Sequence, residues 1–198
     1  MDREYVDLQV NGYMGIDFSA PNLTIEDLHK VSTFLSEKGV AAYCPTVVTS
    51  SLEVYRHNLP LIASVTKNGG PGAQVLGVHL EGPFLSPETG ARGIHQAEHI
   101  RRPDISFYKR LEDLCDGSQA LITVAPDQAG AAKLIQHITS TSKTVVSLGH
   151  HTAHSGQIEE AIEAGAKAAT HVGNGLPTLL HRHENPLWKI LADDRLYA

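Results

Sequence analysis

Three residues that could bind a catalytic metal stand far apart in the sequence: Glu81, His150 and His171. Each comes at the end of an apolar run that predicts a short buried strand. The carboxyl ends of parallel strands lie at one edge of a sheet or barrel, so these side chains could meet in the fold. Two imidazoles and one carboxylate would leave one position open on a zinc ion, which is the arrangement of a catalytic site. Such an ion polarises a carbonyl group and lowers the pKa of bound water.

The residues alone leave plainer interpretations open. Glu81 stands where a strand breaks at Gly82-Pro83, so it could be a solvated loop carboxylate. Histidines at strand ends can also be ordinary hydrogen-bonding groups. A structural zinc site is disfavoured, because the only cysteines, Cys44 and Cys115, form no cluster.

The composition is that of a soluble globular protein, and the length suits one domain over residues 1–198. The sequence is 41% hydrophobic and 19% charged, and its net charge of −6 comes without a basic stripe, which argues against nucleic-acid binding. No apolar run approaches the roughly 20 residues that cross a bilayer. The 12 histidines are an unusual number, and histidine is a common metal ligand and a frequent acid or base.

The cysteines and the N-terminus indicate a cytoplasmic protein. Cys44 and Cys115 have no CxxC spacing, which suits a reducing compartment and no disulfide framework. Residues 1–4 are charged and lack the apolar core of a signal peptide.

Strands and helices are predicted to alternate six times, which favours a parallel α/β fold. Pro60 is expected to kink or split the second helix, and Ser155 is expected to cap the fifth. No GxGxxG or P-loop motif occurs, so nucleotide binding has little support. The predicted strands cover residues 5–10, 40–48, 75–80, 120–125, 144–148 and 168–172. The predicted helices begin near residues 24, 52, 105, 128, 155 and 186.

A long polar segment, residues 82–103, separates the third strand from the third helix. It is rich in glycine and charge and includes Gly93-Ile94-His95. The segment is too long for a simple connector, and long ordered loops in compact domains are often functional.

Five motifs occur in an order that points to a known family. They are Gln9-Val10-Asn11-Gly12, Pro45-Thr46, His79-Leu80-Glu81-Gly82-Pro83-Phe84, Gly149-His150 and Thr170-His171-Val172-Gly173-Asn174-Gly175. With them the chain resembles, nearly end to end, the N-acetylglucosamine-6-phosphate deacetylases of the amidohydrolase superfamily. HLEGPF together with the two histidine motifs is highly specific, whereas Pro45-Thr46 alone would be weak.

The resemblance implies a (β/α)8 TIM barrel of the metal-dependent hydrolase type, of which this chain holds about six β/α units. It implies that Glu81, His150 and His171 bind one divalent metal ion, usually Zn²⁺, with Fe²⁺ or another ion in some members. Gln9 and Asn11 take the place near the metal where many amidohydrolases carry a His-x-His pair for a second ion. Neutral amides are poor ligands for such an ion, so we expect one metal.

The resemblance also implies residues that bind a phosphorylated amino sugar. His95 looks like a residue that contacts the sugar, and Asn174 and Gly175 match the segment that contacts the phosphate. Arg182 resembles an arginine that reaches the phosphate across the interface of a homodimer, and a guanidinium fork suits that anion. The alternative for Arg182, which lies between two histidines, is a solvated loop residue.

Part of the family pattern has no counterpart in this chain. The aspartate that acts as general acid and base is expected beyond Ala198, with the last two strands of the barrel, and the family's N-terminal strand segment is absent. Asp193 and Asp194 are poor replacements, because they are predicted at the opposite end of the barrel. We expect either a fragment of a longer protein or a short relative that closes its barrel with a partner.

Three further histidines call for separate interpretation. His151 could replace its neighbour as a metal ligand, although the ungapped interval to His171 favours His150. His79 shares the strand face of Glu81, and a satisfied core histidine is the preferred interpretation. His154 is expected on the surface near the start of a helix.

The expected function is the deacetylation of N-acetylglucosamine 6-phosphate to glucosamine 6-phosphate and acetate, in amino-sugar catabolism. One alternative is another amidohydrolase that acts on a different N-acyl substrate. The other is a truncated, non-catalytic relic that binds metal.

Overall fold

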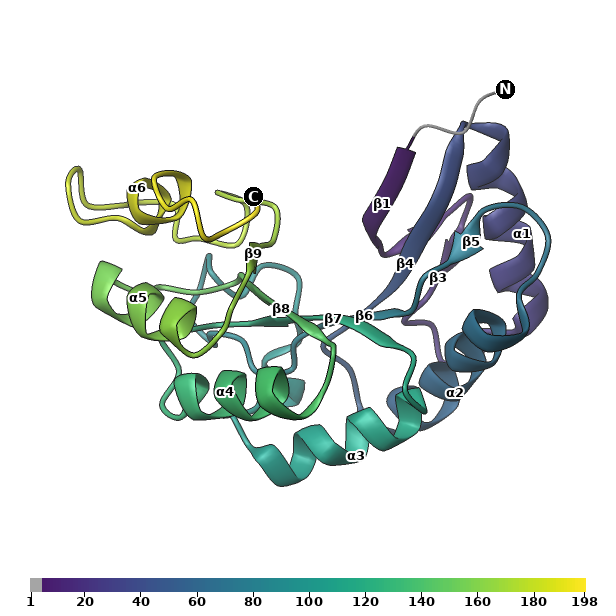
Figure 1. Cartoon of the computed structure of the whole chain (residues 1–198), viewed down its shortest axis with the longest axis horizontal. Coiled ribbons are helices and arrows are strands. Elements are labelled where there is room, and N and C mark those ends of the chain that lie inside the picture. Colours follow the sequence, from purple (N-terminus) through teal and green to yellow (C-terminus); the bar gives the residue numbers. More distant parts are fainter. Residues whose placement is uncertain (1–4) are drawn as a thin grey trace. The chain divides into compact units, whose positions relative to one another are not determined.

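The computed structural model describes residues 5–198, along which strands and helices alternate (Figure 1). Residues 1–4, which are charged and lack the apolar core of a signal peptide, lie outside these described residues. The strands are β1 (Tyr5–Val10), β2 (Gly12–Tyr13), β3 (Ile16–Asp17), β4 (Val40–Val48), β5 (Gln74–Val75), β6 (Val78–Glu81), β7 (Gln119–Val124), β8 (Val145–Leu148) and β9 (Ala168–Ala169). The helices are α1 (Ile25–Glu37), α2 (Leu52–Asn68), η1 (Ala97–His99), α3 (Ile105–Cys115), α4 (Ala131–Thr141), α5 (Ser155–Glu163) and α6 (Pro186–Leu191).

The chain divides into two compact units that alternate along the sequence. The first consists of Met1–Leu80 and Ser106–Ala120, and the second of Glu81–Ile105 and Leu121–Ala198. Glu81, His150 and His171 all belong to the second unit. The single domain expected over residues 1–198 stays a prediction.

In the first unit, β4 pairs in parallel with both β1 and β5. Helices α1 and α2 pack against each other, and they cover β4 and β5 respectively (Figure 1). Leu28 of α1 and Tyr43 of β4 are fully buried in this layer. Asn58 of α2 is buried as well, and its amide donates to the carbonyl oxygens of Phe18 (2.8 Å) and Ala20 (2.9 Å). These two hydrogen bonds from the Asn58 amide nitrogen therefore hold the chain before α1 to α2.

Both cysteines are free, and both side chains lie in the core of the first unit. Burial raises the pKa of Cys44 to about 11 and that of Cys115 to about 12. Alkylation requires the thiolate, which is scarce at such pKa values. We expect iodoacetamide to leave both thiols unmodified in the native protein at neutral pH and to modify both in a urea-unfolded control, as counted by mass spectrometry. Rapid labelling of either thiol in the native protein would contradict this packing.

The second unit is built on the parallel strands β7, β8 and β9. Helix α4 packs on β8 and on α5, and α5 packs on α6. Three hydroxyl groups join the strands, because Thr170 Oγ1 lies 2.8 Å from Thr123 Oγ1 and 2.6 Å from Ser147 Oγ. His150 follows the end of β8 by two residues, and His171 follows the end of β9 by two. Both histidines therefore lie just beyond the carboxyl ends of their strands, as the sequence predicted.

The predicted class of fold, parallel strands alternating with helices in about six β/α units, is confirmed. The strand predicted at residues 75–80 is broken, however, at Gly77, where φ is 144°. Only glycine fits at this position, because a Cβ would lie 2.5 Å from the carbonyl oxygen of Ser118. Helix α2 runs through Pro60 without splitting. The N-cap of α5 is His154 rather than Ser155, since the His154 ring accepts hydrogen bonds from two backbone N–H groups of the first turn.

Within the described residues, no helix combines the length and the apolar character needed to cross a bilayer.

Candidate metal centre

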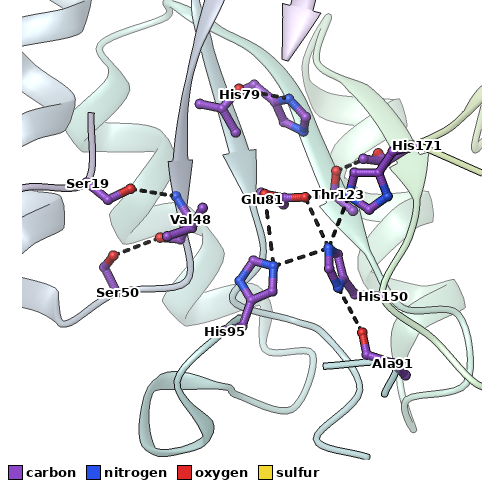
Figure 2. Close-up of polar contacts among 12 residues, drawn as sticks. Ser19, Val48, Ser50, His79, Glu81, Ala91, His95, Thr123, His150 and His171 are labelled. Atoms are coloured by element: carbon purple, nitrogen blue, oxygen red, sulfur yellow. Dashed lines mark hydrogen bonds and ion pairs between the residues drawn. The ribbon is translucent and has the colours of Figure 1, made fainter. Parts of the chain in front are cut away.

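Three side chains from separate strand ends meet in the second unit: Glu81, His150 and His171 (Figure 2). Glu81 Oε1 lies 3.1 Å from His150 Nε2 and 2.9 Å from His171 Nε2. The two Nε2 atoms are 3.2 Å apart. Ligands bound tetrahedrally about 2.0–2.1 Å from a zinc ion stand roughly 3.3 Å from one another. The triangle of donor atoms therefore has nearly the dimensions that one ion requires.

A hydrogen bond on the far side of the His150 ring fixes which nitrogen faces this triangle. His150 Nδ1 lies 2.8 Å from the carbonyl oxygen of Ala91. A carbonyl oxygen only accepts, so Nδ1 carries the proton, and in the neutral ring Nε2 presents a lone pair to the Glu81 carboxylate. Two acceptors 3.1 Å apart repel each other unless a cation lies between them. The donor set therefore fits a bound cation, and a ring N–H held by a backbone carbonyl is typical of metal-binding histidine.

The electrostatics of Glu81 agree with this interpretation. The carboxylate is buried, with an exposed fraction of 2%. Burial alone would raise its pKa, but the close imidazole rings of His150 and His171 hold the pKa well below its ordinary range. In His171, burial lowers the pKa, and the hydrogen bond and charge of Glu81 outweigh that effect, so the pKa is raised. A buried anion among imidazoles is what a divalent cation would neutralise.

Both histidines sit on unusual backbone. The φ angle is 53° at His150 and 30° at His171, in a region that is unfavourable for residues with a side chain. Backbone hydrogen bonds stabilise these conformations, from Ser86 N–H to the His150 carbonyl (3.0 Å) and from Asn174 N–H to the His171 carbonyl (2.9 Å). Strained backbone of this kind persists where the surroundings over-determine it, and it clusters at functional sites.

His95, predicted to contact the sugar, lies against the same cluster. Its Nε2 atom is 3.2 Å from His150 Nε2 and 4.0 Å from Glu81 Oε2 (Figure 2). Burial and the neighbouring His150 lower the pKa of His95 to about 4, so the ring is neutral at neutral pH. Because His150 Nε2 presents a lone pair, His95 Nε2 is the protonated nitrogen and the donor of this contact. The structure thus brings His95 to the candidate metal centre, and the sugar contact itself stays a prediction.

The segment predicted to contact phosphate touches the metal centre through its backbone. The Gly175 carbonyl accepts a hydrogen bond from His151 N–H (3.0 Å). A Cβ on Gly175 would lie 2.8 Å from the backbone nitrogen of His150, so the loop packs directly on that residue. The preceding Asn174 is exposed. The roles of Asn174 and Gly175 in phosphate binding stay predictions.

Arg182 lies in an exposed loop, outside the triangle of candidate ligands. Its carbonyl oxygen accepts a hydrogen bond from Trp188 Nε1 (3.0 Å), which fixes the loop backbone. Its guanidinium group forms no ion pair with any residue that the structure describes. The side chains of Leu179 and Trp188 beside it are 90% and 59% exposed.

Two further histidines, His79 and His151, lie close in sequence to candidate ligands but have other roles. His151 is buried, and its Nδ1 accepts a hydrogen bond from Ala153 N–H (3.2 Å), so it does not join the triangle. Burial lowers the pKa of His151 to about 4.

His79 is buried in the first unit, with Nδ1 3.0 Å from the carbonyl oxygen of Leu8 and 3.3 Å from Thr46 Oγ1. The interpretation of His79 as a satisfied core histidine is confirmed.

Gln9 and Asn11 lie at the end of β1 in the first unit, and their expected place near the metal stays a prediction.

The Asp193 carboxylate forms ion pairs with Lys189 Nζ (2.8 Å) and Arg195 Nη2 (2.7 Å). The hydrogen bonds from Arg195 and Lys189 lower the pKa of Asp193, and they outweigh burial, which would raise it. It therefore behaves as a structural anion of the C-terminal segment.

Sequence reasoning missed Ala91, whose carbonyl oxygen orients the ring of His150. Every residue type has a backbone carbonyl oxygen, so no sequence motif could have identified this one. The only local signal was the glycine and histidine of Gly93-Ile94-His95, in the same segment.

Comparisons with known proteins relate the chain to a group of sugar-phosphate deacetylases. No family model matches it. The chain is 38% identical over 198 residues to N-acetylglucosamine-6-phosphate deacetylase of Bos taurus, with 98% of this chain and 47% of that protein covered. It is 33% identical over 195 residues to N-acetylgalactosamine-6-phosphate deacetylase of Escherichia coli O157:H7, with 98% and 50% covered.

Two solved structures of N-acetyl-D-glucosamine-6-phosphate deacetylase from Mycobacterium smegmatis match the fold, with TM-scores of 0.87 and 0.85 at 28% identity. The second is a mutant in complex with N-acetyl-D-glucosamine-6-phosphate. The matches cover 98% and 97% of this chain and 49% and 48% of those chains. The chain thus spans about half the length of the relatives it matches, and its fold is a partial (β/α)8 barrel.

Proposed function

We propose that this chain, as a relative of one half of the N-acetylglucosamine-6-phosphate deacetylases, carries the metal-binding part of such an active site. The reaction is hydrolysis of the N-acetyl amide of N-acetylglucosamine 6-phosphate, which gives glucosamine 6-phosphate and acetate in amino-sugar catabolism. The convergence of Glu81, His150 and His171 is the observation that supports this most strongly. Hydrolysis of an unactivated amide at neutral pH gains most from a metal site with an open position.

Glu81, His150 and His171 would hold one divalent ion. Two imidazole nitrogens and a carboxylate oxygen suit Zn²⁺, while Fe²⁺ and other divalent ions also accept this donor set. When bound, the ion supplies a Lewis acid that polarises the acetyl carbonyl and makes water more acidic. Ala91 keeps the lone pair of His150 Nε2 aimed at the ion position, through the hydrogen bond to Nδ1.

The remaining polar groups bind and orient the sugar phosphate. His95 carries a donor N–H that lies among the ligand atoms, so it can bind a hydroxyl or carbonyl oxygen of the bound sugar. Asn174 and the backbone N–H of Gly175 bind the phosphate. Arg182 contacts the phosphate in the active site of a second copy of the chain, in a homodimer. Its exposed guanidinium and the exposed apolar side chains of Leu179 and Trp188 support such an interface.

Proton transfer to the departing nitrogen requires a general acid. The resemblance assigns this role to an aspartate that has no counterpart in residues 1–198. Asp193 does not take it over, because its carboxylate is held by Lys189 and Arg195. Binding of metal and sugar phosphate therefore tests this chain more directly than turnover does.

We propose the cytoplasm as the location of this protein. Cys44 and Cys115 support it, because both are free thiols and reduced cysteines are typical of that compartment.

An assay of acetate release separates the proposed function from its alternatives. The zinc-loaded chain is incubated with N-acetylglucosamine 6-phosphate and, in parallel, with an N-acyl amino acid. Steady release from the sugar phosphate alone supports the deacetylase and excludes the relic. Release only from the N-acyl amino acid would identify a different amidohydrolase. Binding of zinc without release from either substrate would favour the relic, unless a chain extended past Ala198 restores turnover.

Replacing Arg182 with alanine is expected to weaken binding of glucosamine 6-phosphate to the zinc-loaded chain by about 10- to 100-fold, because a hydrogen bond to a charged group contributes about 1.5–3 kcal/mol. Isothermal titration measures the dissociation constant. Glucosamine without phosphate is the control ligand, and its affinity should not change. Equal affinities of wild type and variant for the phosphorylated sugar would refute the role of Arg182.

A further inference from the structure

The segment of residues 86–95 surrounds the ring and backbone of His150. Ser86 N–H donates to the His150 carbonyl (3.0 Å), and the Ala91 carbonyl accepts from His150 Nδ1 (2.8 Å). The ring of His95 meets that of His150 edge-on, with centroids 4.3 Å apart. All of these contacts lie within the second unit. One segment thus fixes the position and the tautomer of this histidine.

Gly93 occupies the point where this segment passes closest to the ring. A Cβ built on Gly93 would lie 3.2 Å from His150 Cε1 and 3.5 Å from His150 Nδ1. Nδ1 is the atom that makes the hydrogen bond to Ala91, and Cε1 is bonded to it in the ring. A side chain at this position would push on the edge of the ring whose N–H must reach the carbonyl oxygen. Gly93 also has φ of 57°, a conformation that asparagine tolerates better than alanine does.

We propose that Gly93 is a positioning residue for metal binding, which rests on the metal site proposed above. By leaving room for the His150 ring, it lets the Ala91 carbonyl hold Nδ1–H, and Nε2 then presents its lone pair to the ion. Loss of such an outer partner typically lowers metal affinity by about 10- to 100-fold. Gly93 acts through His150 and does not touch the ion or the substrate.

The test compares zinc affinity, measured by competition with a chromophoric chelator, in wild type, Gly93→Ala and Gly93→Asn. Both variants add a Cβ beside His150, whereas asparagine relieves most of the backbone strain. We expect both to bind zinc about 10- to 100-fold more weakly than wild type. The control is Ile94→Ala, in the same segment, where the side chain is 81% exposed. It should bind zinc as wild type does.

A second measurement reports the tautomer directly. Long-range ¹H–¹⁵N spectra of the metal-free protein should show His150 with its proton on Nδ1 in wild type, and loss of this single tautomer in both Gly93 variants. A merely structural role for Gly93 would not change the tautomer.

Each outcome decides the proposal. Zinc affinity within twofold of wild type in Gly93→Ala would overturn it, and so would full recovery in Gly93→Asn, because backbone strain would then be the cause. If neither variant folds, Gly93 is a folding residue and the proposal is wrong. If the wild type itself binds no zinc, the metal site fails rather than the role of Gly93, and the tautomer spectra still test the contact with His150.

Discussion

Zinc affinity is expected to fall by more than about 100-fold when His150 is replaced by alanine, since loss of an outer partner alone typically costs about 10- to 100-fold. The substitution removes one of three direct ligands and leaves Glu81 and His171 as an incomplete pair. It also removes the Nε2 atom that lies 3.1 Å from Glu81 Oε1 and 3.2 Å from His171 Nε2. Equilibrium dialysis followed by elemental analysis measures the zinc bound per chain.

The neighbouring histidine provides a matched control. His151 is buried next to His150 but is turned to the Ala153 N–H, so His151→Ala should keep one zinc per chain. The opposite pattern, with zinc lost from His151→Ala and retained by His150→Ala, would show that the sequence motif had been assigned to the wrong histidine. Retention of zinc in both variants would place the metal elsewhere.

Zinc is expected to raise the midpoint of thermal unfolding by about 8–16 °C. A ligand present at 1,000 times its dissociation constant stabilises the native state by about 4 kcal/mol, if it does not bind the unfolded chain. In a chain of this size, 1 kcal/mol corresponds to about 2–4 °C. Differential scanning calorimetry with zinc or with a chelator measures the shift.

The control for this stabilisation is Glu81→Gln, which keeps the shape of the side chain and removes its charge. A neutral amide is a poor ligand for zinc, so the shift on adding zinc should nearly vanish in this variant. A shift of the same size in Glu81→Gln and in wild type would mean that zinc stabilises the fold from another site, such as the exposed histidines His181 and His183.

The sequence predicted the elements and the three candidate ligands because these depend on local pattern. Apolar runs that end at a carboxylate or a histidine can be recognised in the sequence, and parallel strands bring such ends together. The order β1, β4, β6, β7, β8, β9, each followed by a helix or a helical connection, is therefore close to what the periodicity indicates.

The features that the sequence did not predict depend on contacts between distant backbone groups. The bond from His150 to the Ala91 carbonyl joins residues 59 positions apart and involves no side chain of Ala91. The strand breaks at Gly77, where φ is 144° and the Ser118 carbonyl lies so close that only glycine fits. His154 caps α5 because its ring happens to reach two N–H groups of the first turn, a role for which the adjacent Ser155 has the higher intrinsic preference.

The most direct test of the metal site is X-ray absorption spectroscopy of the zinc-loaded chain. We predict nitrogen and oxygen ligands at about 2.0–2.1 Å, with the outer scattering of two imidazole rings from His150 and His171. His150→Ala should reduce that outer scattering or leave no zinc to measure. A sulfur shell at about 2.3 Å, or a spectrum without imidazole scattering, would contradict this prediction.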